Sequence, residues 1–205
     1  MTRVLMLFAA ATIMLGIGAG AYVMLGRGGD QFAECRRGAV AGGAATIGGP
    51  FSLINGDGVR MTEVDAITKP TLLYFGYTFC PDFCPTDLAR NAIAADILAE
   101  RGLDIGQVFI SIDPARDTTE AVREFAEFIH PDLIGLTGTP AEVAAAANEY
   151  RVYFNKSGDD PELYLMDHST FTYLVAPAVG FLEFFPSDAT PEDIADVSAC
   201  FMSNL

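Results

Sequence analysis

Lysine is nearly absent from this sequence. Only Lys69 and Lys156 occur among its 205 residues, and 12 basic residues face 27 acidic ones, for a formal net charge of −15. Such a chain has no basic stripe for phosphate contacts and repels nucleic acids and anionic lipid surfaces, which excludes a nucleic-acid-binding function. The simplest role of the acidic surface is solubility, although it would also attract cations or a basic patch on a partner.

Cysteine is scarce as well. The four cysteines, Cys35, Cys80, Cys84 and Cys200, do not make the dense disulfide framework of a small secreted scaffold, and 205 residues can form a hydrophobic core without one. We expect Cys35 and Cys200 to be incidental thiols. A Cys35–Cys200 disulfide is the alternative, because the sequence does not show the distance between the two residues.

Charge is missing altogether from residues 4–25, a run of 22 residues. A helix rises about 1.5 Å per residue, so this run is long enough to cross a hydrocarbon core of roughly 30 Å. A cleavable signal peptide is the alternative, since Ala19-Gly20-Ala21 resembles a cleavage site. The apolar run continues beyond that site, which favours an uncleaved anchor.

These features divide the chain into three parts. We expect a membrane anchor over residues 1–26, a flexible linker rich in Gly and Ala over 27–47, and a folded domain over 48–205. The arginines that follow the anchor mildly favour the opposite orientation from that of an exported domain, by the positive-inside rule.

Within the expected domain, strand and helix patterns alternate. Asn55-Gly56-Asp57-Gly58, between two short apolar stretches, predicts a β-hairpin. Apolar runs then predict strands, and capped stretches of helical period predict helices. The predicted strands are 71–77, 108–112, 133–138, 171–175 and 180–185, and the predicted helices start after Cys84, at an N-cap formed by Asp117, at Thr139 and at Thr190. This order is typical of an α/β, thioredoxin-like fold.

The segment YFGYTFCPDFCPTDL, residues 74–88, places Cys80 and Cys84 four residues apart, each followed by proline. In the expected fold they lie at the exit of a central strand and in the first turn of the next helix, where the helix dipole favours thiolates. At this spacing they would face the same side of one helical turn and share a metal ion. Two soft thiolates suit Cu(I), whereas structural zinc takes four ligands. A redox pair and a structural role stay open, although the usual redox motif has two intervening residues.

Histidine occurs only twice. His168, in the stretch DHS, lies in a predicted loop beside a strand, where it would supply a third ligand and strengthen the metal interpretation. His130 ends a predicted helix, and we expect it to be a satisfied or solvated cation at the helix C-terminus.

Several segments, taken in order, resemble the Sco/SenC family of copper chaperones, which help to metallate cytochrome c oxidase. They are GYTFCPDFCPTDL, SIDPARDT, HPDLIGLTG, YRVYF and DHSTFTYLV, and the resemblance covers about residues 48–203 together with the N-terminal anchor. One departure is visible, because Ala176-Pro177-Ala178-Val179-Gly180 is one residue longer than the family's Asp-Pro-x-Gly turn.

The resemblance implies a ligand set and a site. It makes Cys80, Cys84 and His168 the ligands of copper, as Cu(I), Cu(II) or both, and it places Asp82 and Asp113 near the metal. It also implies a thioredoxin-like domain behind a single-pass transmembrane helix in the cytoplasmic membrane of a bacterium, with the domain in the periplasm.

The function implied is that of a membrane-anchored metallochaperone, not an enzyme. It would deliver copper to the CuA site in the copper-accepting subunit of cytochrome c oxidase during assembly. The first alternative is a thiol–disulfide oxidoreductase that uses Cys80 and Cys84 to reduce the acceptor's cysteines, with no required role for His168. The second is a redox or copper sensor. A peroxidase is disfavoured, because no cysteine has the expected Thr-x-x-Cys context.

Overall fold

The structure is a computed structural model that describes residues 31–38, 46–160 and 163–205. The chain divides into two units, Met1–Glu34 and Cys35–Leu205, and the fold is that of the second unit. Among the described residues, no helix is both long and apolar enough to cross a membrane. The anchor expected at residues 1–26 lies outside the described residues, as does much of the expected linker.

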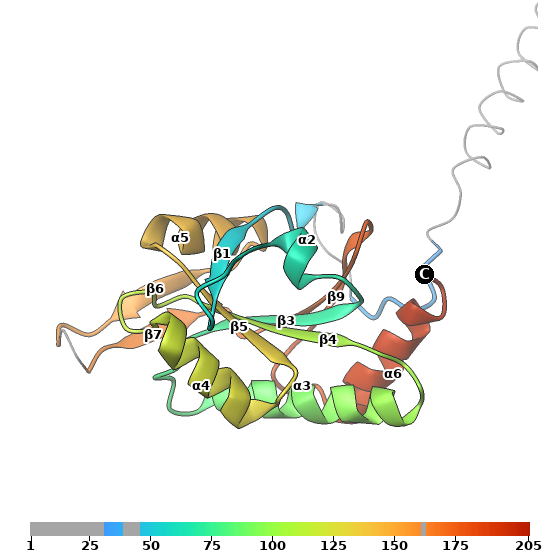
Figure 1. The fold of residues 1–205 in the computed structure, drawn as a ribbon. Helices are drawn as coiled ribbons and strands as arrows, with labels where there is room; N and C mark the ends of the chain where they lie inside the picture. Colours follow the sequence, from blue (N-terminus) through green and yellow to red (C-terminus); the bar gives the residue numbers. More distant parts are fainter. Residues whose placement is uncertain (1–30, 39–45, 161–162) are drawn as a thin grey trace, which may run out of the picture. The chain divides into compact units, whose positions relative to one another are not determined.

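A seven-stranded mixed sheet forms the centre of the second unit (Figure 1). Its strands are, in spatial order, β2 (Arg60–Thr62), β1 (Ser52–Asn55), β5 (Leu133–Thr137), β4 (Gly106–Ser111), β3 (Thr71–Gly76), β8 (Thr172–Ala176) and β9 (Gly180–Phe185). The three middle strands β5, β4 and β3 are parallel, and the outer pairs are antiparallel. All six residues of β3 are buried, because a strand in the middle of a sheet with both faces covered must be apolar throughout.

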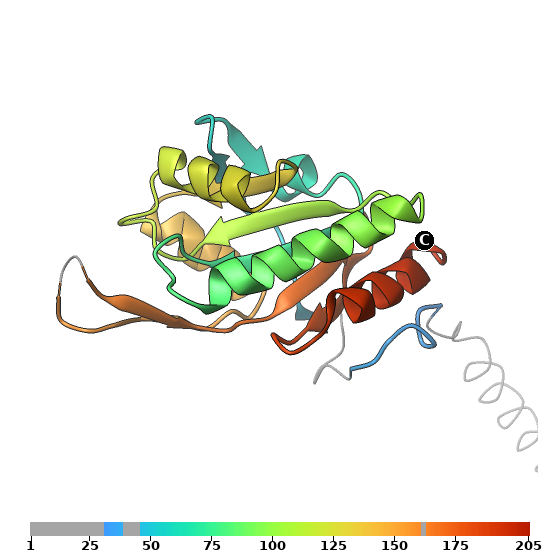
Figure 2. The same cartoon turned by 90° about the horizontal axis from the view of Figure 1, so that it is seen from below.

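Helices cover both faces of this sheet. They are α2 (Glu63–Ala66), α3 (Phe83–Glu100), α4 (Thr119–Ile129), α5 (Pro140–Glu149) and α6 (Pro191–Met202). Figure 1 shows α3, α4 and α6 on one face and α5 on the other, and Figure 2 shows α3 and α6 side by side. The crossovers through α3 and α4 join neighbouring parallel strands, which is how the N-terminus of α3 comes to lie at the end of a central strand.

The helix starts follow the capping residues, with one correction. Thr139 and Thr190 cap α5 and α6 as predicted, and each side chain accepts a backbone N–H of the first turn. The N-cap of α4 is Thr118, however, so the prediction of Asp117 is wrong by one residue. Asp117 is buried instead, and its carboxylate accepts hydrogen bonds from Thr78 and Ser111.

A second, two-stranded sheet was not predicted. It consists of β6 (Phe154–Ser157) and β7 (Leu165–His168), which pair antiparallel. His168 is therefore the last residue of a strand, and the prediction that it lies in a loop is wrong. These strands escaped detection because most of their residues are exposed and carry little apolar pattern.

The first residues of the second unit are tied to its last helix. Cys35 and Cys200 form a disulfide, so the expectation of two incidental thiols is wrong and the alternative pairing is the one observed. Beside it, the buried carboxylate of Glu183 accepts hydrogen bonds from the backbone N–H groups of Arg37 and Gly38. Part of the segment expected to be a free linker is therefore hydrogen-bonded to the folded unit. A buried carboxylate such as that of Glu183 needs donors, and the backbone of Arg37 and Gly38 supplies them.

Candidate metal centre

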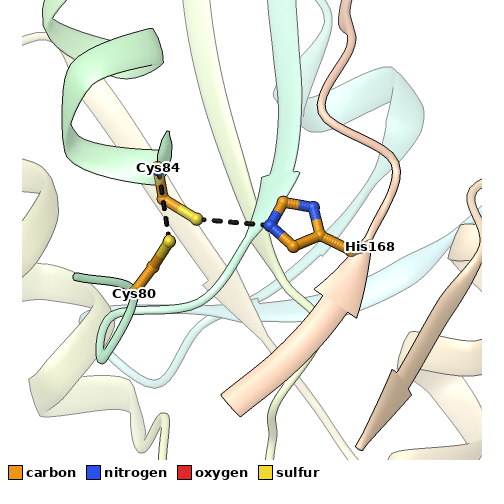
Figure 3. A group of neighbouring side chains, drawn as sticks. All are labelled: Cys80, Cys84 and His168. Carbon is orange, nitrogen blue, oxygen red and sulfur yellow. Dashed lines mark hydrogen bonds between the residues drawn. The ribbon is translucent and has the colours of Figure 1, made fainter. Parts of the chain in front are cut away.

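Cys80, Cys84 and His168 meet at one end of the central sheet (Figure 3). Cys80 lies in the loop after β3, Cys84 in the first turn of α3, and His168 at the end of β7. One ligand atom from each, two Sγ atoms and an imidazole nitrogen, lies within 4.8 Å of the others. The two segments are 84 residues apart in the sequence, and the fold brings them together.

The two cysteines do not share a helical turn, so the predicted same-side helical geometry is wrong in detail. Only Cys84 is helical, and Cys80 sits in a turn in which its N–H donates to the carbonyl of Tyr77. The Cys84 backbone N–H then donates to the Cys80 Sγ at 3.3 Å. Because the N-cap Asp82 makes no side-chain cap, this sulfur satisfies an N–H group at the helix start.

The two sulfurs differ in protonation. The pKa of Cys80 is lowered to about 4, mainly by a hydrogen bond from the Cys84 thiol and also by backbone N–H groups of Cys84 and Asp82, against the opposing effect of burial. The pKa of Cys84 is raised, because its proton is held in that hydrogen bond and the side chain is buried. The pair therefore carries one thiolate, on the more accessible Cys80.

His168 presents a free nitrogen to the sulfurs. Its Nδ1 lies 2.8 Å from the carbonyl oxygen of Ser169, which can only accept, so Nδ1 carries the proton in this contact. Nε2 is left with its lone pair and lies 3.5 Å from the Cys84 Sγ. In metal-ligating histidines, the ring nitrogen that does not bind the metal usually donates its N–H to a backbone carbonyl, a carboxylate or water, as Nδ1 does here.

An open hollow of about 330 Å³ adjoins the site. Cys80 and His168 line it, together with Phe83, Leu165 and Met166. Cys84 is fully buried and lies outside the lining. Any incoming ligand or metal ion therefore reaches Cys80 and His168 before Cys84.

The other predicted residues, Asp82, Asp113 and His130, supply no ligand atom to the group formed by Cys80, Cys84 and His168. Asp82 contributes a backbone hydrogen bond that lowers the pKa of Cys80, while its side chain is exposed beside the hollow. Asp113 is buried and binds Arg116 and Tyr164 rather than a sulfur. His130 is the C-cap of α4, where its Nδ1 accepts a backbone N–H and its Nε2 faces Asp96, so both ring nitrogens have partners as expected, while its positive charge stays a prediction.

Two aromatic residues at the site escaped the sequence analysis. Tyr74 and Tyr77 are 0% and 2% exposed, and their rings meet the His168 ring edge to face at centroid distances of 6.2 and 6.0 Å. The Tyr74 hydroxyl also donates to the buried Asp87 at 3.0 Å. In the sequence both tyrosines belong to the apolar run of a core strand, and no local signal separates them from ordinary core residues.

Comparison with known proteins agrees with this geometry. Residues 39–203 match the SCO1/SenC family. Protein SenC of Rhodobacter capsulatus is 48% identical over 204 residues, which cover 100% of this chain and 91% of that protein. The mitochondrial SCO1 homolog 1 of Arabidopsis thaliana is 46% identical over 155 residues, which cover 75% of this chain but only 46% of that protein.

A solved structure extends the likeness to three dimensions. The crystal structure of Arabidopsis thaliana ScoI with copper bound superimposes with a TM-score of 0.72 at 45% identity, and covers 77% of this chain and 99% of that one. The expected thioredoxin-like α/β fold is confirmed by this match. The family match over most of the chain and the identity over the whole length of SenC lead to one conclusion: this chain belongs to the SCO1/SenC family.

Proposed function

We propose that this protein is a copper-binding metallochaperone that carries copper on Cys80, Cys84 and His168. The observation that carries the proposal is the convergence of two sulfurs and one imidazole nitrogen within 4.8 Å from distant segments. The copper-bound structure of a relative with 45% identity supports it.

The donor set fits copper. Two sulfurs, one of them already a thiolate, suit the soft ion Cu(I), and the added imidazole nitrogen suits Cu(II). Structural zinc would take four protein ligands, and the described residues bring only three to this site. Because Cys80 borders the hollow, ligand exchange with a partner's thiols would begin there and end at the buried Cys84.

The proposed acceptor is the copper-accepting subunit of cytochrome c oxidase, at its CuA site. We place the domain in the bacterial periplasm, tethered by an anchor over residues 1–26 and a linker that reaches residue 47. The similarity to SenC, a bacterial protein, supports a bacterial origin, and the Cys35–Cys200 disulfide supports an oxidising compartment such as the periplasm.

A thiol–disulfide oxidoreductase is the second candidate. Its support is the low pKa of Cys80, since an accessible thiolate beside a buried thiol is also the arrangement of a dithiol reductant. It needs Cys80 and Cys84 but not the imidazole. His168 therefore distinguishes the two functions.

The deciding variant is His168→Ala, with His130→Ala as the matched control. With copper as cargo, His168→Ala should weaken Cu(II) binding by at least about 10- to 100-fold, the usual effect of losing even an indirect partner of a metal, and Cu(I) binding less. His130→Ala should bind both ions like the wild type. The measurements are competition with chelators for the thiol-reduced protein and oxidase assembly in cells at low copper. A His168→Ala strain that assembles fully active oxidase under those conditions would refute the three-ligand chaperone and favour the reductase.

A further inference from the structure

The candidate copper ligands stand on two separate sheets. Cys80 and Cys84 follow β3 of the seven-stranded sheet, whereas His168 ends β7 of the two-stranded one. Within the described residues, no strand ladder joins β6 or β7 to the larger sheet. Apart from residues 169–171, which link β7 to β8, side chains therefore set the distance between the imidazole and the sulfurs.

Arg116 is one side chain that touches both parts, and it contacts the residue before β7 through a hydrogen bond and through a ring. It lies in the loop between β4 and α4, and its guanidinium binds the carboxylate of Asp113 and donates from Nη1 to the carbonyl oxygen of Tyr164 at 2.9 Å. Tyr164 directly precedes β7, the strand that ends in His168. Its hydroxyl donates to the same Asp113 at 2.6 Å, so the base of β7 is bonded to the β4–α4 loop twice.

Aromatic rings enclose the same guanidinium. The Arg116 Cζ lies 3.6 Å from the ring centroid of Tyr164, 4.7 Å from that of Phe79 and 5.8 Å from that of Tyr77. Phe79 is the residue before Cys80, and Tyr77 meets the His168 ring. Arg116 thus packs between the loop that carries Cys80 and the start of the strand that carries His168.

A guanidinium is suited to this place and an ammonium is not. Its plane stacks on aromatic faces while its fork of N–H groups binds a carboxylate and a carbonyl in fixed directions. A lysine at position 116 would keep the positive charge but would lose the planar stacking and the rigid fork that directs the two hydrogen bonds.

We infer that Arg116 is a positioning residue for the copper site: it clamps the β6–β7 hairpin to the Cys80 loop and so sets where the His168 imidazole meets the two sulfurs. This inference rests on the proposed function. It implies that Arg116 matters more for Cu(II), which needs the imidazole nitrogen, than for Cu(I), which two sulfurs satisfy.

The test compares Arg116→Lys with Arg123→Lys; Arg123 is a partly exposed arginine of α4 that pairs with Glu127 and serves as the matched control. Each full-length variant is purified, reduced and loaded with Cu(II) or Cu(I). We expect Arg116→Lys to release Cu(II) at least about tenfold faster, the lower end of the effect of losing a residue that orients a ligand, with Cu(I) affinity changed by less than about threefold. Its Cu(II) electron paramagnetic resonance spectrum should lose part of the nitrogen hyperfine coupling, and Arg123→Lys should match the wild type.

A second variant separates positioning from folding. Tyr164→Phe keeps the ring under the guanidinium and removes only the hydroxyl bond to Asp113, so it should shift the same spectrum in the same direction by a smaller amount. Urea unfolding of the copper-free proteins shows whether each variant is folded. Arg116→Lys with a wild-type Cu(II) spectrum and release rate would overturn the clamp and leave the proposed function standing. A wild-type protein that binds no copper would instead overturn the proposed function.

Discussion

Cys80 and Cys84 share one motif yet differ in burial, hydrogen bonding and charge. Cys84 is 0% exposed and keeps its proton, while Cys80 borders the hollow as a thiolate. The thiolate accepts two kinds of donor from Cys84, the thiol and the backbone N–H. Cys84 thus makes Cys80 nucleophilic and ready to bind a soft metal ion at neutral pH.

This asymmetry gives a prediction for the copper-free, reduced protein. Cys84→Ala removes the thiol donor but keeps the backbone N–H, so the pKa of Cys80 should rise from about 4 towards the ordinary range. Because only the thiolate reacts with iodoacetamide, the reactive fraction of Cys80 at pH 5 should fall by about tenfold for each unit by which its pKa comes to exceed 5, and alkylation should slow with it. The pH profile of alkylation, followed by mass spectrometry, measures it. Cys80→Ser is the control and should leave the buried Cys84 unreactive; equal rates in Cys84→Ala and wild type would contradict the assigned donor.

Among the elements, the last residue of β3 packs directly against a candidate copper ligand of α3. Gly76 is the last residue of β3, and a methyl group there would lie 2.8 Å from the Cys84 Sγ and 2.9 Å from a ring carbon of Tyr74. Both neighbours are buried and held by other contacts, so neither can move away at low cost. The close approach of strand to helix at this point requires glycine.

Gly76→Ala should therefore damage both stability and copper binding. Overpacking of a buried contact typically costs about 1–3 kcal/mol, and displacement of Cys84 should weaken Cu(I) binding as well. Gly49→Ala is the matched control, because its methyl group would meet only the flexible end of Glu149. Urea unfolding and Cu(I) competition measure the two effects. A Gly76→Ala protein as stable as Gly49→Ala, with wild-type Cu(I) affinity, would show that the end of β3 can accommodate a methyl group and would contradict this prediction.

At the scale of the whole folded unit, the disulfide and the metal site occupy different regions. Cys200 belongs to α6, which packs along the C-terminal part of α3, where Arg101 pairs with Asp196. Cys84 lies at the opposite end of α3, in its first turn. The disulfide should therefore stabilise the fold without entering the chemistry of the site.

The double variant Cys35→Ser/Cys200→Ser tests this separation. Loss of a disulfide that closes a long loop typically lowers the free energy of unfolding by about 2–5 kcal/mol, and release of the segment bonded to Glu183 would add to the loss. The variant should still fold cooperatively, because the core of the unit lies between the sheet and the helices. Its copper affinity should match the wild type. A large loss of copper binding in a folded variant would mean that the disulfide and the metal site are energetically coupled, and would contradict this prediction.

How much the sequence alone predicts differs between elements and contacts. The strands of the main sheet and the long helices were predictable, because apolar runs and capping residues such as Thr139 act within a few neighbouring residues. The exposed β6–β7 hairpin has no such local pattern, and the N-cap of α4 was misplaced because Asp117 is as good a capping residue as Thr118 until its burial is known.

By itself, the sequence determined the secondary structure of the core, the residue types of the candidate site and their resemblance to one family. Only the tertiary structure decided that Cys80 holds the thiolate, that His168 turns its Nε2 to the sulfurs, that Arg116 joins two sheets and that Cys35 pairs with Cys200. The reason is distance along the chain. Helix caps and strand patterns depend on neighbours within one or two turns, whereas the contacts of His168, Arg116 and Cys35 join residues from 48 to 165 positions apart. The hydrogen bond from Cys84 to Cys80 is local, but the burial that keeps Cys84 protonated depends on the packing of the whole unit.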